Sequence, residues 1–191
     1  MLGLGNGIPT GSAGDELLAS YVDTFQNAPA LSYDSWNYWS LEGSATTPGP
    51  QGNLENGDEG AVLFAFLSNQ TSDAGLIKSI TSSGVSGDYM VVSYEISVGV
   101  NASKWGDGSS GNDIPVRTKW GGVTSSATNV PITNHGAGRV AISETLTATG
   151  SYSSSEDNSL IVAFLASDGE LPLAGASIYL QNVRAHVYRP I

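Results

Sequence analysis

The C-terminal run of residues 175–191 most narrows what this chain can fold into, because its hydrophobic residues alternate and then change phase. Ile178 and Leu180 occupy even positions, whereas the hydrophobic residues from Val183 to Val187 occupy odd ones. Alternation with a period of two indicates a strand with one buried face, and a single extra residue within a strand shifts that phase by one. The pattern therefore predicts a long C-terminal strand with a β-bulge between its even and odd halves.

Further strand-like runs precede this one, separated by loops rich in Gly, Ser, Asn and Asp. They cover residues 61–67, 76–80, 89–98, 114–120, 140–148 and 160–165. The runs at 61–67 and 160–165 are continuously apolar, which is typical of strands buried on both faces, and we expect them to be central neighbours. About seven to nine strands with almost no helix predict an all-β fold, a jelly-roll β-sandwich.

Residues 1–54 differ from the rest because Gly and Pro are dense in them. Helical periodicity is confined to Asp15–Tyr21, which predicts about one or two helical turns. The stretch Tyr33–Leu41 is the aromatic centre of this segment. We therefore expect an extended N-terminal segment, residues 1–54, to pack partly on a sandwich formed by residues 55–191.

Charge and composition exclude several classes of function. The net charge is −11 with only seven Lys and Arg residues, so the chain lacks the clustered cations that bind nucleic acid. The absence of cysteine excludes disulfides, thiolate metal sites and thiol catalysis. The longest apolar runs, about seven residues, are too short to span a membrane. The first nine residues lack the pattern of a signal peptide, which predicts synthesis and folding in the cytosol.

No motif for catalysis is present. His135 and His186 fall in a loop and in the C-terminal strand, and no Gly-x-Ser-x-Gly, His-Glu-x-x-His or phosphate-binding motif occurs. The paired acids, such as Glu156 and Asp157, lie beside Gly, Ser or Asn, where solvated loop carboxylates are expected. We therefore predict that the protein is not an enzyme.

Oxygen ligands gather in the loop at residues 107–113. Asp107, Asn112 and Asp113 offer the ligand atoms that Ca²⁺ prefers, although the spacing of an EF-hand and its terminal Glu are missing. Asp and Asn are also common turn formers, because their side chains hydrogen-bond the local backbone. A turn is the favoured interpretation, a structural Ca²⁺ ion is the alternative, and no other cofactor is expected.

The tryptophans are the candidates for stacking on sugar rings, because they present flat apolar faces. They are Trp36, Trp39, Trp105 and Trp120. We expect Trp105, which lies in a polar loop, to be exposed, and Trp36 and Trp39 to pack the N-terminal segment onto the sandwich. The alternative for each of them is a place in the core.

Residues 85–191 resemble the back half of jelly-roll carbohydrate-binding modules. Four runs carry the resemblance in the order and spacing typical of that family: Tyr89–Val98, Ala141–Thr149, Leu160–Leu165 and a closing Gly-x-x-Ile-Tyr-Leu-x-Asn-Val pattern at Gly175–Val183. The resemblance implies a jelly-roll fold, and such modules often hold a structural Ca²⁺ ion.

The opening stretch Met1–Gly7 resembles the start of many small virion proteins of tailed bacteriophages, which often carry jelly-roll domains as head decoration, tail or fibre proteins. This resemblance implies a virion location, with copies of the same chain, in a trimer, and the major capsid protein as partners. Leu2, Leu4 and Ile8 would then form an assembly arm that orders against a neighbouring subunit; a disordered tail is the alternative.

The sequence thus favours a non-enzymatic virion protein that decorates or cements a phage capsid. The alternative is a carbohydrate-binding module of a tail or fibre protein, in which Trp105 and Trp120 stack on host-surface glycans. Neither hypothesis involves nucleic acid or a membrane.

Overall fold

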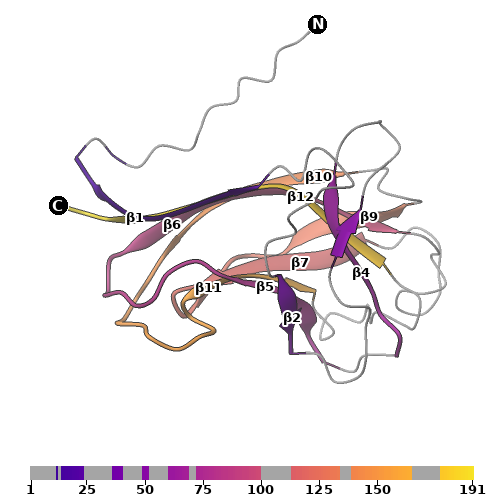
Figure 1. Ribbon diagram of the computed structural model, residues 1–191, viewed down its shortest axis with the longest axis horizontal. Helices are drawn as coiled ribbons and strands as arrows, with labels where there is room; N and C mark the ends of the chain where they lie inside the picture. Colours follow the sequence, from indigo (N-terminus) through magenta and orange to yellow (C-terminus); the bar gives the residue numbers. More distant parts are fainter. Residues whose placement is uncertain are drawn as a thin grey trace, which may run out of the picture.

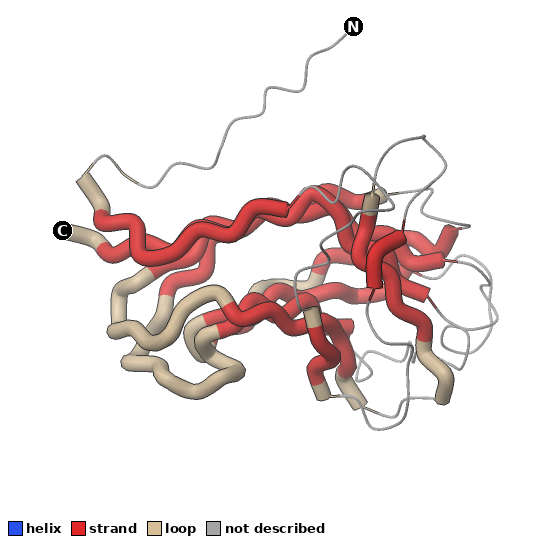
Figure 2. Tube along the Cα trace, viewed as in Figure 1, coloured by secondary structure: helices blue, strands red, loops and turns tan. Residues whose placement is uncertain are grey.

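The computed structural model describes residue 12 and residues 14–23, 36–40, 49–51, 60–68, 72–99, 113–133, 139–164 and 177–191. Within these ranges all regular structure is β-strand (Figures 1 and 2). The strands are β1 (Glu16–Asp23), β2 (Asn37–Trp39), β3 (Gly49–Gln51), β4 (Ala61–Ala65), β5 (Ala74–Ser79), β6 (Tyr89–Gly99), β7 (Asp113–Trp120), β8 (Val123–Thr124), β9 (Thr128–Thr133), β10 (Val140–Thr147), β11 (Ser159–Phe164) and β12 (Ser177–Arg189). The described residues include no helix with the length and apolar character needed to cross a membrane.

The strands form two layers that lie face to face (Figure 1). In the first layer, sheet A, β6 pairs along one side of β12, and β4 and β1 pair with the two halves of its other side. β10 extends this sheet beyond β6, and β3 extends it beyond β4. The second layer, sheet B, has the order β2-β5-β11-β7-β9, with β8 beside the end of β7.

Strand β9 connects the two sheets. Its residues Thr128–Pro131 pair antiparallel with β7 of sheet B, and Ile132 and Thr133 then pair parallel with β6 of sheet A. Every other pairing among the described strands is antiparallel. The predicted all-β jelly-roll sandwich is confirmed.

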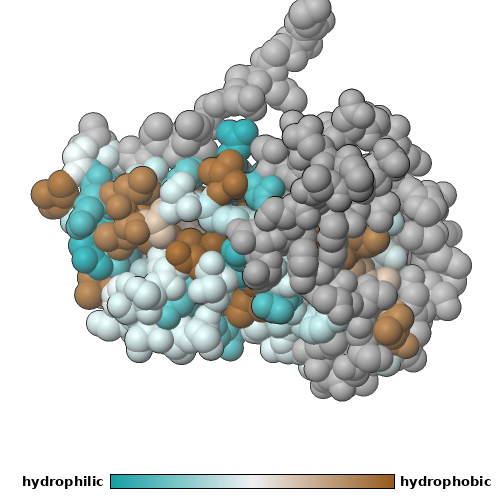
Figure 3. All heavy atoms as spheres, viewed as in Figure 1, coloured by the Kyte–Doolittle hydropathy of each residue, from teal (hydrophilic) through white to brown (hydrophobic). Residues whose placement is uncertain are grey.

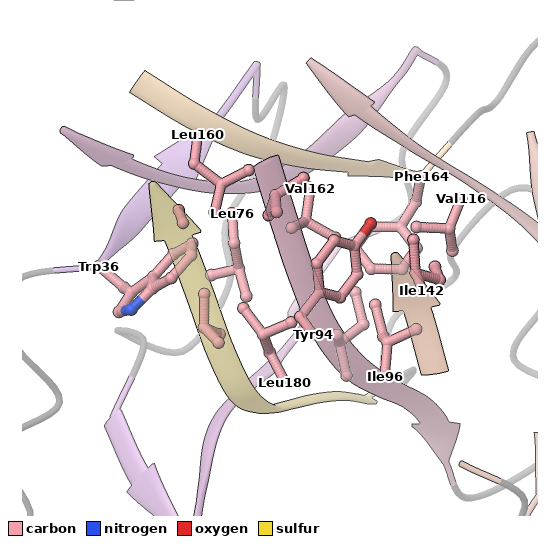
Figure 4. Close-up of a cluster of buried hydrophobic side chains, with 14 of the residues drawn as sticks. Trp36, Leu76, Tyr94, Ile96, Val116, Ile142, Leu160, Val162, Phe164 and Leu180 are labelled. Atoms are coloured by element: carbon pink, nitrogen blue, oxygen red, sulfur yellow. The ribbon is translucent and has the colours of Figure 1, made fainter. Parts of the chain in front are cut away.

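The hydrophobic core fills the space between the sheets, and alternate residues of each strand supply it. Figure 4 shows Tyr94 and Leu180 of sheet A among side chains of sheet B such as Leu76 and Val162. Full burial of one such side chain contributes about 1.5–3 kcal/mol to folding. The hydroxyl group of Tyr94 is hydrogen-bonded to that of Thr118 at 2.9 Å, and burial raises the pKa of Tyr94. The core therefore holds a polar pair without leaving it unsatisfied.

The predicted β-bulge in the C-terminal strand is confirmed. The register between β12 and β6 shifts between Gln181 and Arg184, so two residues of β12 oppose one of β6. Asn182 takes a left-handed φ of 49°, and its amide donates a hydrogen bond to Glu95 Oε2 at 3.0 Å. Asn tolerates this conformation better than most side chains, which explains why the phase change occurs at this residue.

Substitution of Asn182 tests the bulge. We expect Asn182→Val to lower the free energy of unfolding by about 1–2 kcal/mol, because a β-branched residue is strained at this φ. Asn182→Gly relieves that strain and is expected to cost less than Val. Urea denaturation of both variants measures the difference, and equal stability of the two would contradict a left-handed residue 182.

Two predictions about strands are wrong. Residues 16–23 form strand β1 instead of a helix, and they pair antiparallel with β12. The register of β1 shifts between Leu17 and Ala19, so Leu18 and Tyr21 both reach the core although they are three residues apart, a spacing that imitates a helix. The apolar strands β4 and β11 are also not neighbours, because β4 lies in sheet A and β11 in sheet B.

The predicted boundary near residue 55 does not separate an N-terminal arm from a sandwich that is complete without it. The first 54 residues supply β1 and β3 to sheet A and β2 to sheet B. The proposed arm residues Leu2, Leu4 and Ile8 lie outside the described residues.

Candidate functional site

The surface of sheet B that faces away from the core, the outer B face, combines an aromatic ring with charged side chains. The antiparallel register arranges its side chains in two rows across the strands. One row is Trp39, Gly75, Ala163 and Arg117, and the other is Asn37, Ile77, Ile161 and Lys119. The outer B face therefore brings together residues from all three thirds of the chain.

Trp39 and Lys119 reach toward each other across this face. Strands β5 and β11 separate β2 from β7, which puts the two backbones roughly 14 Å apart. Lys119 Nζ nevertheless lies over the Trp39 ring, 4.2 Å from its centroid. Both side chains must therefore lie along the sheet, which is consistent with the burial of the outward-facing Ile161 and Ala163.

Gly75 is the residue opposite Trp39 in the register of β2 and β5. Gly75 lies so close to β11 that a Cβ atom there would be 2.1 Å from the carbonyl oxygen of Val162. Trp39 as a whole is only partly buried, but its indole nitrogen is buried and has no hydrogen-bond partner among the described residues. The ring thus combines an apolar surface with a donor that the described part of the chain does not satisfy.

A surface pocket of about 200 Å³ adjoins the charged end of the outer B face. Lys119, Val123, Thr124, Glu156, Asp157 and Ile161 are among its lining residues. Lys119 Nζ lies 3.6 Å from Glu156 Oε1, and the Ser154 hydroxyl donates to Asp157 Oδ2 at 2.8 Å. Through Lys119, the charged lining of this pocket adjoins the Trp39 ring, an arrangement that suits a ligand with an apolar face and polar hydroxyl groups.

Trp36 and Trp120 cannot stack on a sugar, because their side chains are 0% and 1% exposed. The Trp36 indole donates a hydrogen bond to the Tyr21 hydroxyl at 3.0 Å, and Trp120 packs edge-on against Tyr152 with centroids 5.0 Å apart. The prediction of a stacking role is wrong for these two residues. Trp120 points inward because it shares the face of β7 that carries Ile114 and Val116.

Of the other predicted site residues, the structure describes only Asp113. Trp105, Asp107 and Asn112 lie outside the described residues, and Asp113 is the first residue of β7. No group of three or more His, Cys, Asp or Glu side chains that could hold a metal occurs in the described part of the chain. The Ca²⁺ site therefore stays a prediction.

A Ser–His contact on the opposite sheet lacks the features of a catalytic pair. His186 Nδ1 lies 3.1 Å from the Ser20 hydroxyl, and burial lowers the pKa of His186, as does the nearby Arg184. Its other ring nitrogen is buried with no partner among the described residues, so no carboxylate of that part orients the imidazole. The second histidine, His135, lies outside the described residues.

Comparison with known proteins identifies the fold. No protein-family model matches the sequence, and neither does any curated protein. A Clostridium thermocellum xylanase 10B fragment with its CBM22-1 and GH10 modules, complexed with xylohexaose, is 9% identical with a TM-score of 0.53 over 90% of this chain and 28% of that one. An arabinose-bound α-L-arabinofuranosidase, MgGH51, is 18% identical with a TM-score of 0.52, covering 93% of this chain and 27% of its own.

A third similar structure is an enzyme of comparable size. A Stig cyclase from Fischerella sp. TAU, bound to an indole compound, is 10% identical with a TM-score of 0.51 over 92% of this chain and 100% of its own. By contrast, this chain covers only about a quarter of the length of the xylanase and arabinofuranosidase chains. The shared feature is the fold. It is the jelly-roll sandwich of carbohydrate-binding modules, and some enzymes carry it too.

Sequence reasoning missed the polar partners of Trp39. The alternation in residues 114–120 puts Arg117 and Lys119 on one face of the strand and Trp120 on the other. This pattern was the available signal for a charged face. No local pattern linked that face to Trp39, because only the pairing of β2 through β5 and β11 to β7 does so.

Proposed function

We propose that this protein is a carbohydrate-binding domain that holds a polysaccharide chain along the outer B face. The observation that carries the proposal is the partly exposed Trp39 ring, flanked by charged hydrogen-bonding groups, on a sheet of a carbohydrate-binding-module-like jelly roll. Aromatic side chains bind sugars through their flat apolar faces, and a few placed polar groups then fix orientation.

The proposed binding event uses Lys119 as a movable cover. Its ammonium group contacts the Trp39 ring and also lies near Glu156. A sugar ring that stacks on Trp39 displaces this ammonium group toward Glu156, so the cation keeps a partner while the ring becomes available. Arg117 and the carboxylates of Glu156 and Asp157 then offer hydrogen bonds to the sugar hydroxyls.

The capsid-decoration hypothesis has no support from the fold or from the comparisons. The stretch on which that hypothesis is based, Met1–Gly7, lies outside the described residues. The virion location, the trimer and the capsid partner stay predictions, and the carbohydrate-binding alternative is the better supported of the two.

Titration with soluble polysaccharides tests the proposed function. Xylan, arabinoxylan, a mixed-linkage β-glucan and mannan serve as probes in affinity gel electrophoresis, with tryptophan emission recorded in parallel. We expect saturable retardation with at least one of them and a matching change in emission. Unchanged mobility in all four gels, at polysaccharide concentrations that retard a known xylan-binding module, would rule out this function.

A further inference from the structure

A larger cavity, of about 700 Å³, opens between β1 and the loop of residues 80–88, which joins β5 to β6. This volume falls within the range of small-molecule sites, about 300–1,000 Å³. Leu18, Ala19, Arg189 and residues 80–85 line it, and it shares none of these residues with the outer B face or with its adjoining pocket. It is therefore a separate candidate site.

Part of the cavity lining is apolar. The register shift in β1 leaves Leu17 outward and 54% exposed, and it lets the next two residues, Leu18 and Ala19, both line the cavity. Bulges re-aim side chains in this way. Ile80 and Val85 add apolar side chains from the loop, and Figure 3 shows several hydrophobic patches at this end of the molecule.

The rest of the lining is polar, and its arginine is held in place by an ion pair. Arg189 donates hydrogen bonds from Nε and Nη2 to the two carboxylate oxygens of Asp88, at 2.8 and 2.9 Å. Its third nitrogen, Nη1, makes no hydrogen bond within the described part of the chain. Thr81, Ser82 and Ser83 belong to the same lining, and the Thr81 hydroxyl donates to the Asn158 carbonyl at 3.3 Å.

The loop that forms the cavity is preformed, because backbone hydrogen bonds tie it to residues 148–158. Gly84 and Tyr152 exchange two of them, at 2.9 and 3.1 Å, and the Asn158 amide donates to the Ser82 carbonyl at 2.7 Å. A Cβ atom at Gly84 would lie 2.1 Å from the Tyr152 ring, so the two segments are in close contact. A ligand entering the cavity would meet a wall that is already ordered, which reduces the entropic cost of binding.

Charge narrows the class of ligand. The fully buried Asp88 neutralises Arg189, and Glu16 is a further negative group close enough to interact with it. The cavity therefore offers hydrogen bonds without net positive charge, which disfavours anions and suits a neutral molecule with one apolar face and several hydroxyl groups. We propose that this cavity is a second binding site, for a neutral monosaccharide or disaccharide. It does not depend on the function proposed for the outer B face.

Amide chemical-shift mapping on the ¹⁵N-labelled full chain tests the proposal. The probes are the methyl glycosides of glucose, xylose, galactose and arabinose, the disaccharides maltose and cellobiose, and glucuronate as the anionic comparison. We expect at least one neutral probe to shift the amides of residues 18–19, 80–85 and 189, with half-saturation on the order of 1–10 mM. Glucuronate is expected to produce no saturable shift there.

Cavity-filling variants separate this site from the other one. Ser83→Trp and Val85→Trp place an indole at exposed lining positions and should weaken binding at least tenfold. Ser153→Trp adds the same group at an exposed position outside both pockets, and Trp39→Ala alters only the outer B face, so both should leave cavity binding unchanged. The proposal is overturned if no neutral probe shifts these amides, if glucuronate binds as well, or if both filling variants bind like the parent chain.

Discussion

Asp88→Asn is expected to lower the free energy of unfolding by about 3 kcal/mol, which for a chain of this length corresponds to a fall of about 9 °C in Tm. The Asp88 carboxylate is fully buried and accepts hydrogen bonds from Arg189, from the Val85 backbone N–H at 3.0 Å and from the Tyr152 hydroxyl at 3.4 Å. It thereby joins the end of β12 to two loops. We place the loss at the lower end for a broken buried ion pair, because Arg189 is 39% exposed and keeps part of its hydration.

Because the Asp88 carboxylate is ion-paired, we also expect the folded protein to lose stability in acid. The hydrogen bonds from Arg189 hold the pKa of Asp88 below its ordinary value of 3.8. A group whose pKa is lower in the folded state stabilises the protein fully above its unfolded pKa, and that contribution disappears as the pH falls from there through the folded value. We therefore expect the parent chain to lose stability below about pH 4 more steeply than Asp88→Asn.

Urea denaturation between pH 2.5 and 7 measures both effects. Tyr152→Phe is the matched control, because it keeps the ring that packs on Trp120 and removes a hydroxyl that donates to Asp88 at a long 3.4 Å and is also hydrogen-bonded to the Thr81 side chain. It should cost less than about 1.5 kcal/mol. Parallel stability curves for the parent and Asp88→Asn across this pH range would contradict the assigned role of Asp88.

Trp39→Ala is expected to weaken polysaccharide binding at least 30-fold, which corresponds to about 2 kcal/mol for a central aromatic contact. The indole supplies the stacking surface of the outer B face, and alanine leaves Lys119 without its aromatic neighbour. Stability should fall much less than in a core variant, because the side chain is only partly buried. Isothermal titration with whichever polysaccharide binds the parent chain measures the change.

An aromatic residue on the other sheet provides the control. Tyr188 lies on sheet A, partly exposed and stacked on Tyr89 with centroids 5.4 Å apart. Tyr188→Ala should leave polysaccharide affinity within about twofold of the parent. If Tyr188→Ala abolishes binding and Trp39→Ala preserves it, the polysaccharide site belongs on sheet A and the assignment to the outer B face is wrong.

The candidate site was predictable only in its parts. The alternation in β7 divides that strand into an apolar face with Trp120 and a charged face with Arg117 and Lys119, so the burial of Trp120 follows from a local pattern. The contact of Lys119 with Trp39 has no local signal. It depends on three strand pairings between distant segments, and side-chain periodicity carries no information about which strands pair.

The fold divides in the same way. The sequence by itself determined the all-β class, most strand positions and the bulge at Asn182, because each of these depends on the alternation of neighbouring residues along the chain. Only the tertiary structure decided that β4 and β11 lie in opposite sheets and that residues 16–23 form a strand beside β12 instead of a helix. For a short amphipathic segment, pairing with a long strand outweighs a weak helical preference, and that partner is more than 150 residues away in the chain.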